Sequence, residues 1–317
     1  MELLSPVSQE VFEVPVLIIG GGVAGISAAL WCARLGLKSL ILERSSRPGG
    51  QLYDIHNTIP DYPAFVGTGK DMASRLIEQM AQFDISCRTD VKVESLDVKE
   101  GRAKSAQGIF QAQAIILATG IQKRLLPLLK AEAFLEKGLY LTASGRRSEF
   151  VDQEVCIIGG GDGAFENALL LADSCPKVTI LYRGTTPRAR PDFVLAVEEL
   201  PHVEYLLEHQ VVDLKGIERL ETLVVQTPEG TKEFSSGATL VKIGMEPRSH
   251  LVREQVVCSP GGFVLVDAFQ RSISHENLWA IGDICTPLDP SISVCVGQAC
   301  VAAREIERTF RKKMSSI

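Results

Sequence analysis

The sequence lacks the residue patterns of a metal site and of a membrane span. Its eight cysteines include no Cys-x-x-Cys pair and its five histidines are scattered, so a zinc site is not expected. No apolar run approaches the roughly 20 residues that a membrane-spanning helix needs. We therefore expect neither a metal centre nor a transmembrane helix.

An excess of basic residues is also missing. The 33 lysines and arginines are outnumbered by 39 acidic residues, and the pI near 5.5 argues against nucleic acid as the main partner. The stretch before the first predicted strand has glutamates but no lysine or arginine, unlike a secretory signal or transit peptide. These features predict a cytoplasmic protein whose cysteines are reduced unless they do redox chemistry.

One glycine-rich unit occurs twice in the chain. In the first copy, the apolar run Val16–Ile19 precedes the glycine-rich stretch 20–25, which is followed by a helical run over Ile26–Leu35 and a strand over Leu40–Glu43. This order of strand, glycine turn, helix and strand is that of a dinucleotide-binding βαβ unit.

The spacing of the glycines gives each one a role. Gly20 makes the turn, Gly22 admits a pyrophosphate and Gly25 lets the helix meet the strand. The N-terminus of the helix then presents free N–H groups to the phosphates. Glu43 ends the second strand, where a ribose hydroxyl needs an acceptor. The first copy therefore predicts a dinucleotide site.

The second copy starts at Val155 and aligns without a gap, with Gly159 at the position of Gly20. Two such units in 317 residues, of which 45% are hydrophobic, predict two domains of ordinary size. The fold class expected is α/β, with two Rossmann-like domains of three layers each.

The second copy differs from the first at its adenosine end. Tyr182 and Arg183 stand where the first copy has Glu43 and Arg44, so the ribose-binding carboxylate is absent. Basic residues of this loop suit an adenosine 2′-phosphate, although a solvated basic loop is an alternative interpretation. These residues are Arg183, Arg188 and Arg190.

Two later strands also end in glycine turns. Ala114–Leu117 leads into Ala118-Thr119-Gly120, and Leu278–Ile281 leads into Gly282-Asp283. Glycine at such a position lets backbone approach a ligand closely.

The remaining elements are read from periodicity and capping signals. Asp71–Phe83 reads as an amphipathic helix, and Val91–Val98 with Gly108–Ala112 reads as a hairpin. A long helix is predicted to end at Lys312, with Asp289 as N-cap and Pro290 at its first position.

Taken together, these residues resemble the low-molecular-weight thioredoxin reductase family of pyridine nucleotide–disulfide flavoenzymes, from about Val14 to Phe310. The motifs that carry the resemblance beyond the glycine turn are Gly49-Gly50-Gln51-Leu52, Ala118-Thr119-Gly120 and Gly282-Asp283. The resemblance implies an FAD-binding domain formed by residues 1–122 and 252–317. It also implies an inserted NAD(P)-type domain over residues 123–251.

The resemblance also implies roles for individual residues. Glu43 would bind the adenosine ribose, Asp283 a ribityl hydroxyl, Gln51 would lie near the isoalloxazine and Val91 near the adenine. The helix that opens at Ser291 would aim its N-terminus at the flavin pyrimidine ring. The other residues implied in FAD binding are Gly20, Gly22, Ala24, Gly25, Arg44, Gly50, Leu52, Asp61, Ala118, Thr119, Gly120, Gly282 and Ile292. For the second dinucleotide they are Gly159, Gly161, Asp162, Gly163, Ala164, Tyr182, Arg183 and Arg188.

Two departures from the family bear on function. Where thioredoxin reductases carry a Cys-x-x-Cys dithiol, this chain has residues 142–145, Thr-Ala-Ser-Gly, which cannot form a disulfide. The family's His-Arg-Arg-x-x-x-Arg signature for NADPH is changed at residues 182–188, where one arginine has become Gly184. Losing one charge-assisted hydrogen bond to phosphate would weaken the binding of NADPH by about 1–3 kcal/mol.

The leading hypothesis is a disulfide oxidoreductase whose cysteines have moved. Cys285 follows Asp283 by two residues, and Cys295 lies on the next helix. A loop that folds back could bring Cys285 beside Cys295, within the Cα–Cα spacing that a disulfide needs. The helix N-terminus would lower a nearby thiol's pKa and make it a better nucleophile. The alternative is that both cysteines are buried apolar residues.

Other readings stay open. The chain is also similar to ferredoxin/flavodoxin–NADP⁺ reductases of the thioredoxin-reductase type, which lack the dithiol. The inserted domain would bind NADP(H), or instead a second FAD that passes electrons to the first. A flavin-binding regulator without turnover is a non-enzymatic alternative. The expected partner is a thioredoxin-like or ferredoxin-like redox protein, or a small disulfide, and a homodimer is expected from the resemblance.

Overall fold

The computed structural model describes residues 10–288 and 290–315, and the chain divides into two compact units. Unit 1 is Met1–Gln122 with Glu246–Ile317, and unit 2 is Lys123–Met245. The return to unit 1 therefore comes earlier than the predicted residue 252. The reason is that the N–H of Arg248 already donates to the carbonyl of Gly120, at 2.9 Å.

Unit 1 is built on a seven-stranded sheet in the order β3-β2-β1-β6-β5-β4, with β17 also paired to β6. Strands β1, β2, β3, β6 and β17 run parallel, whereas β4, β5 and β6 pair antiparallel. The strands are β1 (Val11–Ile19), β2 (Ser39–Leu42), β3 (Ser86–Arg88), β4 (Val93–Asp97), β5 (Arg102–Ser105), β6 (Gly108–Leu117) and β17 (Leu278–Ala280).

The prediction of a hairpin between Val91–Val98 and Gly108–Ala112 is wrong. Strand β4 pairs with β5, and β6 is one continuous strand whose first half pairs with both β5 and β1. The Gln111–Ala114 stretch does not break the strand, because β1 continues beside it from Val11 to Ile19.

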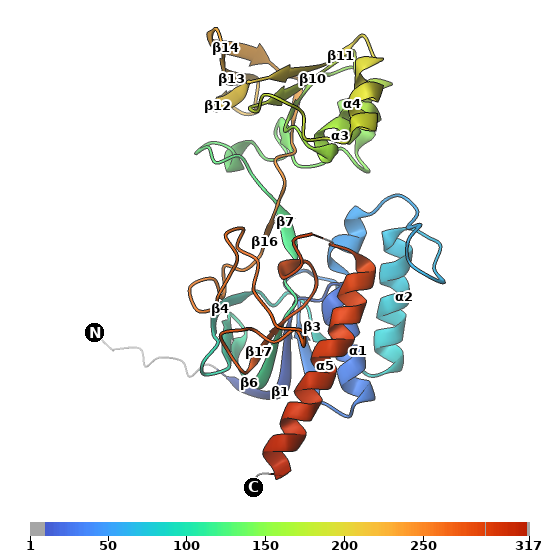
Figure 1. Ribbon diagram of the computed structural model, residues 1–317, viewed down its shortest axis with the longest axis vertical. Coiled ribbons are helices and arrows are strands. Elements are labelled where there is room, and N and C mark those ends of the chain that lie inside the picture. Colours follow the sequence, from blue (N-terminus) through green and yellow to red (C-terminus); the bar gives the residue numbers. More distant parts are fainter. Residues whose placement is uncertain (1–9, 289, 316–317) are drawn as a thin grey trace, which may run out of the picture. The chain divides into compact units, whose positions relative to one another are not determined.

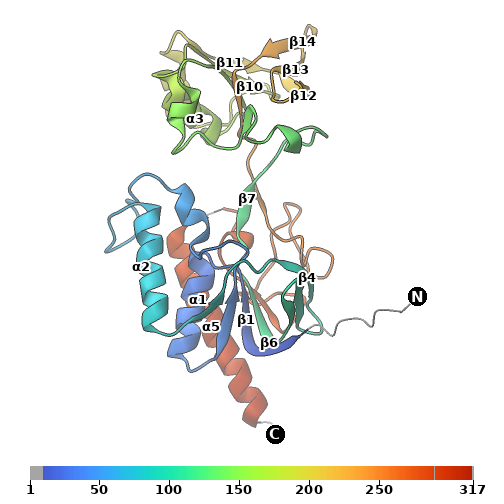
Figure 2. The same cartoon turned by 180° about the vertical axis from the view of Figure 1, so that it is seen from behind.

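Alternate side chains of β1 point to opposite faces of the sheet, as a strand requires. Val16 and Ile18 pack against helices α1 (Val23–Arg34) and α5 (Ile292–Ser315), whereas Leu17 and Ile19 pack on the other face. Helices α1, α5 and α2 (Gly69–Gln82) lie side by side on the first face (Figures 1 and 2). The apolar cluster on the opposite face also includes side chains of β4 and β5 and of the segment 251–266.

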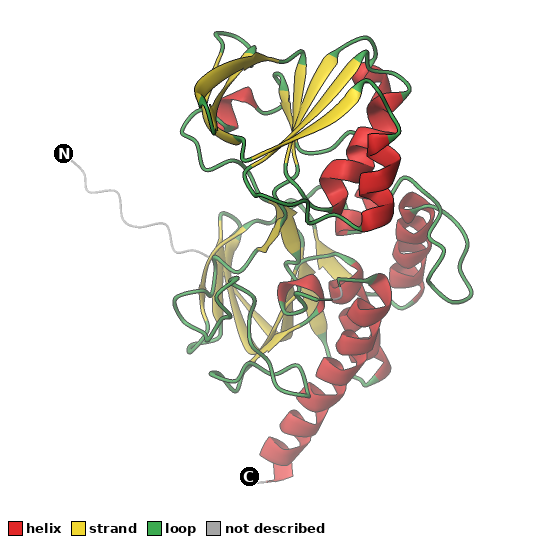
Figure 3. Cartoon of the chain, turned by 45° about the horizontal axis from the view of Figure 1, so that its top comes forward, coloured by secondary structure: helices red, strands yellow, loops and turns green. Residues whose placement is uncertain are grey.

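Unit 2 has a five-stranded parallel sheet in the order β11-β10-β9-β15-β8. Two helices cover one face and a three-stranded antiparallel sheet, β12-β13-β14, covers the other (Figure 3). The elements are β8 (Leu139–Tyr140), β9 (Glu154–Ile158), α3 (Asp162–Ala172), β10 (Lys177–Tyr182), α4 (Pro191–Glu198), β11 (Val203–Leu207), β12 (Gln210–Lys215), β13 (Thr222–Thr227), β14 (Gly230–Ser235) and β15 (Ala238–Val241).

Short elements join these parts. Strands β7 (Ile121–Lys123) and β16 (Met245–Pro247) pair with each other where the chain passes from one unit to the other and back. Each unit is thus a three-layer α/β domain, as predicted. No helix in the described part of the chain is long and apolar enough to cross a membrane.

Two helix starts differ from the prediction. Helix α2 is capped by Thr68, which forms a capping box with Asp71. Helix α5 begins at Ile292, and the Ser291 hydroxyl accepts the N–H of Val294, so Ser291 has the N-cap role. Pro290 is therefore outside the helix, and the predicted cap Asp289 lies outside the described residues.

Candidate functional site

The first glycine turn leaves space at only one of its three spaced glycines. A Cβ placed on Gly20 would lie 2.4 Å from the carbonyl oxygen of Ala118, and one on Gly25 would lie 1.9 Å from that of Gly20. A Cβ on Gly22 would meet nothing within 4 Å, and no side chain caps helix α1, which starts there. Gly20 and Gly25 therefore close the turn, and Gly22 leaves an open approach to uncapped N–H groups, as an anion requires.

Glu43 is fixed beside this turn. Its side chain is 6% exposed, and its Oε2 accepts the N–H of Gly21 at 2.7 Å. Its Oε1 accepts the N–H of Ser45 at 2.8 Å. Each oxygen keeps a further lone pair, so the carboxylate can still accept hydroxyl groups of a ligand.

Four segments far apart in sequence meet at the same turn. The N–H of Gly49 donates to Gly21, and a Cβ on Gly50 would lie 3.1 Å from the Cα of Gly22. Gln51 donates its Nε2 to the carboxylate of Asp283 at 3.0 Å. A Cβ on Gly120 would lie 3.3 Å from the same Nε2. The motif residues thus form one cluster.

The structure places the other candidates of unit 1 around this cluster or away from it. Ala24 contacts Gly282: a Cβ added to Gly282 would lie 3.0 Å from the Cβ of Ala24. Leu52 and Val91 are buried in two different apolar clusters, and Ile292 packs partly against the one that holds Leu52. Arg44 and Asp61 are exposed.

The second glycine turn is built in the same way, with different neighbours. A Cβ on Gly159 would lie 2.2 Å from the carbonyl oxygen of Lys242, and Gly161 and Gly163 face open space. No side chain caps helix α3, which follows. Ala164, at the place of Gly25, is buried in the apolar cluster beneath helices α3 and α4.

The aromatic ring of Tyr182 takes the place of the missing carboxylate. A Cβ on Gly160 would lie 2.3 Å from the ring, so the ring lies directly against the turn where Glu43 lies in the first copy. The arginines nearby differ in their partners. Arg190 is held by Asp162, which also accepts its backbone N–H at 2.8 Å, whereas Arg183 and Arg188 are exposed.

Lys242 also lies at this second turn, although no sequence motif predicted it. It follows β15 as Ala118 follows β6, and burial lowers its pKa to about 8, aided by repulsion from Lys123 and opposed by Glu166. The signal was present in the sequence: Lys242-Ile243-Gly244 follows a buried strand, β15, as Ala118-Thr119-Gly120 follows β6.

Cys285 and Cys295 flank the Gly282 turn as free thiols. The Cys285 Sγ lies 3.3 Å from the carbonyl oxygens of Ala280 and Gly282. The Cys295 Sγ lies 3.7 Å from Asp283 and would lie 3.1 Å from a Cβ on Gly282.

The expected lowering of their pKa values is wrong. Burial raises the pKa of Cys285 to about 11 and that of Cys295 to about 12, and Asp283 adds to both increases. Desolvation and a neighbouring carboxylate outweigh the helix N-terminus, so both sulfurs are protonated at neutral pH.

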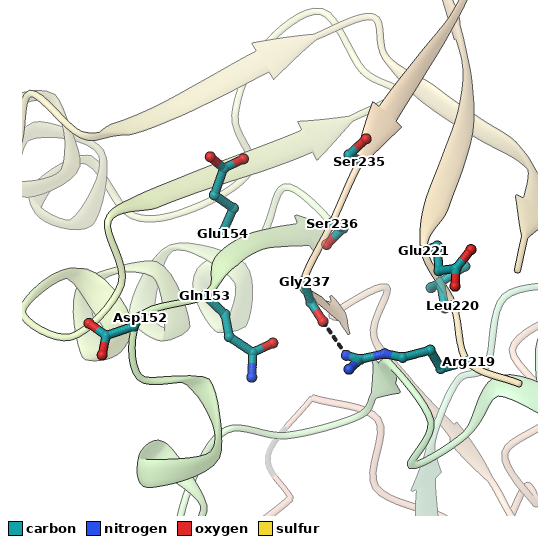
Figure 4. A pocket seen from close by; sticks show the side chains of 9 residues that line it. All are labelled: Asp152, Gln153, Glu154, Arg219, Leu220, Glu221, Ser235, Ser236 and Gly237. Carbon is teal, nitrogen blue, oxygen red and sulfur yellow. Dashed lines mark hydrogen bonds between the residues drawn. The ribbon is translucent and has the colours of Figure 1, made fainter.

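A shallow hollow also lies on unit 2, at the opposite edge of its sheet (Figure 4). It is lined at the amino ends of β9 and β15, and Arg219 crosses it to donate to Gly237 at 2.6 Å. Ligands of parallel sheets bind at the carboxyl ends of the strands. The hollow is therefore separate from the second glycine turn.

The first turn, with its open glycine, uncapped helix and buried carboxylate, fits an adenine dinucleotide. Together with the second turn it defines a protein with two dinucleotide-binding domains. The family model described as pyridine nucleotide-disulphide oxidoreductase matches residues 14–305. The chain belongs to this family, and it is an FAD-dependent oxidoreductase of the thioredoxin-reductase type.

Named relatives agree with this placement. The chain is 32% identical to the bifunctional thioredoxin reductase/thioredoxin of Mycobacterium leprae, over 95% of this chain and 67% of that protein. It is 30% identical to the thioredoxin reductase of Mycolicibacterium smegmatis, over 95% and 97% of the two chains. The crystal structure of Lactococcus lactis thioredoxin reductase in its FR conformation covers 93% of this chain and 98% of its own, with 25% identity and a TM-score of 0.80.

Proposed function

We propose that this protein is a disulfide reductase that binds FAD in unit 1 and takes electrons from NADPH bound in unit 2. The observation that carries the proposal is the contrast between its two glycine turns. The first has Glu43 at its adenosine end, and the second has Tyr182 with Arg183 and Arg188. A carboxylate suits a free ribose, and arginines suit a 2′-phosphate.

In unit 1 the chain's own groups bind and orient the cofactor. The N–H groups that open helix α1 bind the diphosphate, and Glu43 accepts the adenosine ribose hydroxyls. Asp283, held by Gln51, is positioned for a ribityl hydroxyl. When bound, FAD supplies an acceptor for two electrons from the pyridine nucleotide and a donor for the disulfide.

In unit 2 the N–H groups that open helix α3 bind the second diphosphate, beside Lys242. An anion placed there favours the charged form of this lysine. Arg183 and Arg188 hold the 2′-phosphate through charge-assisted hydrogen bonds.

Reduction of the flavin by pyridine nucleotide tests this assignment. Flavin-loaded full-length protein should lose its visible flavin absorption faster with NADPH than with NADH under anaerobic conditions. Arg188→Gln should lower the affinity for NADPH about tenfold to a hundredfold and leave the affinity for NADH unchanged, because one charge-assisted contact to phosphate is lost. The measurement is the dependence of the reduction rate on nucleotide concentration.

Arg219→Gln is the matched control, because it removes an exposed arginine of unit 2 from the other edge of the sheet. Its NADPH affinity should equal that of the wild type. If neither nucleotide bleaches the flavin, the NADPH assignment fails. Two flavins per chain would then favour the second FAD, which the relatives do not support.

For the acceptor, we retain Cys285 and Cys295 as a relocated relay. The supporting observation is that the Cys285 Sγ lies 3.3 Å from the carbonyl oxygen of Gly282, while the Cys295 Sγ lies 3.7 Å from the Asp283 carboxylate, so both border the proposed flavin site. In this step a Cys285–Cys295 disulfide would take up two electrons, which bound FAD would supply, and two protons; its S–S bond would break and two thiols would form. Their raised pKa values favour this protonated product.

Counting thiols tests the relay. Protein kept oxidised and protein treated with a reductant are unfolded and their thiols titrated, since the folded thiols are protonated and slow to react. The relay predicts two more thiols after reduction in the wild type and no difference in Cys285→Ser or Cys295→Ser. Cys258→Ser, which changes a partly buried thiol elsewhere in unit 1, should keep the two-thiol difference.

The absence of that difference in the wild type would favour a second candidate, direct transfer from the flavin to an external acceptor. The observation in its favour is the protonation of both thiols. An acidic ferredoxin-like carrier would need a basic patch, for which the sequence offers Lys123, Arg124, Arg146 and Arg147. Two of these four candidates are neutralised, because Arg146 is paired with Glu136 and Glu149, and Arg147 with Asp173. These pairs favour a thioredoxin-like protein or a small disulfide as the acceptor.

A further inference from the structure

Arg248, which no motif includes, is anchored at the cofactor cluster of unit 1. It follows β16, and its backbone N–H donates to the carbonyl of Gly120 at 2.9 Å. Its own carbonyl accepts the hydroxyl of Thr119 at 2.9 Å. The Thr119 backbone in turn borders the first turn, because a Cβ on Gly20 would lie 3.3 Å from the Thr119 Cα. Arg248 is thus fixed by two backbone contacts next to the turn.

The guanidinium of Arg248 has only weak neutral partners. Its Nε lies 3.3 Å from the Gln122 Oε1 and its Nη1 lies 3.4 Å from the carbonyl of Thr119. Within the part of the chain that the structure describes, no carboxylate forms an ion pair with it. Both distances are at the long end of hydrogen bonding.

The surroundings of Arg248 would be stabilised by a bound anion. Burial and repulsion from Arg44 lower its pKa, while Glu43 and Asp54 attract it from a distance. Glu43 is held in place by the N–H groups of Gly21 and Ser45, and in that position it forms no ion pair with Arg248. A partly buried cation beside another cation is costly unless a counter-ion is present.

We propose that Arg248, assisted by Arg44, binds the diphosphate of the dinucleotide held by unit 1. The inference rests on the proposed binding of FAD there and adds a cation to a site otherwise built from backbone N–H groups. A guanidinium presents its N–H groups in a fork that matches phosphate oxygens. The contact comes from the segment that returns from unit 2, so it exists only once that segment has joined unit 1.

The test compares three probes on full-length protein freed of flavin: FAD, ADP and riboflavin. ADP carries the diphosphate without the flavin, and riboflavin carries the flavin without phosphate. Arg248→Gln should lower the affinities for FAD and ADP by the same factor, about tenfold to a hundredfold, and leave the affinity for riboflavin unchanged. The loss should shrink at high salt, because screening weakens the wild-type contact, and Arg248→Lys should restore part of the affinity.

Arg253→Gln is the control. It removes the same charge from an exposed position of the same segment and should bind every probe as the wild type does. If Arg248→Gln bound FAD and riboflavin more weakly but ADP normally, the guanidinium would lie at the flavin ring and the proposal would be overturned. Equal affinities in Arg248→Gln and wild type would also overturn it, as would equal losses in the Gln and Lys variants with a lower melting temperature. Failure of the wild type to bind FAD and ADP would instead refute the FAD assignment.

Discussion

Gly25→Ala is expected to give a colourless protein of greatly reduced stability. The new Cβ would lie 1.9 Å from the carbonyl oxygen of Gly20. Gly20 cannot move away, because the backbone of Ala118 packs against its Cα: a Cβ on Gly20 would lie 2.4 Å from the carbonyl oxygen of Ala118. Helix α1 must therefore move away from β1, at a cost of about 3 kcal/mol or more. Thermal unfolding and flavin bound per chain measure the effect.

Gly22→Ala is the matched substitution in the same turn. Its φ of −77° is open to any residue, and its Cβ would meet nothing within 4 Å. The variant should fold like the wild type and bind FAD more weakly, since the methyl group enters the space assigned to the diphosphate. Wild-type flavin binding by Gly22→Ala would show that the diphosphate passes elsewhere. Normal stability of Gly25→Ala would show that the helix is free to move.

Glu43→Gln should cost both stability and cofactor affinity. The amide can accept one of the two N–H groups that now meet the carboxylate, at 2.7 and 2.8 Å, but turns an NH₂ toward the other. Charge-assisted hydrogen bonds are worth about 1.5–3 kcal/mol each, so the free energy of unfolding should fall by about 2–4 kcal/mol. FAD affinity should fall tenfold to a hundredfold, measured by titration of the flavin-free protein.

Glu13→Gln provides the control for net charge, because Glu13 is exposed on β1 in the same unit. It should change neither quantity. If Glu43→Gln lost stability but bound FAD normally, Glu43 would be a structural clamp for the glycine turn and not a ribose ligand.

The glycine units were predictable because local pattern and fold agree there. Apolar runs, glycine spacing and the following helix all lie within about 30 residues in each copy, so no distant contact is needed to recognise them. The α/β class and the insertion of one domain in the other followed from this repeat and the resemblance.

What the sequence did not reveal depends on distant partners. The continuity of β6 is set by its pairing with β1 and β5, which periodicity alone does not show. The thiol pKa values depend on burial and on Asp283, and burial outweighed the helix N-terminus. Arg248 lies next to the first turn although 228 positions separate it from Gly20 in the chain (248 − 20 = 228).

The split of unit 1 has a consequence for the order in which the chain can fold as it leaves the ribosome. Lys123–Met245 is contiguous and complete before the last strand and helix of unit 1, β17 and α5, have been synthesised. Until then the apolar face of α1 that α5 covers, and the edge of β6 with which β17 pairs, stay open. The nascent amino-terminal half is thus exposed to aggregation and to chaperones longer than the insert is.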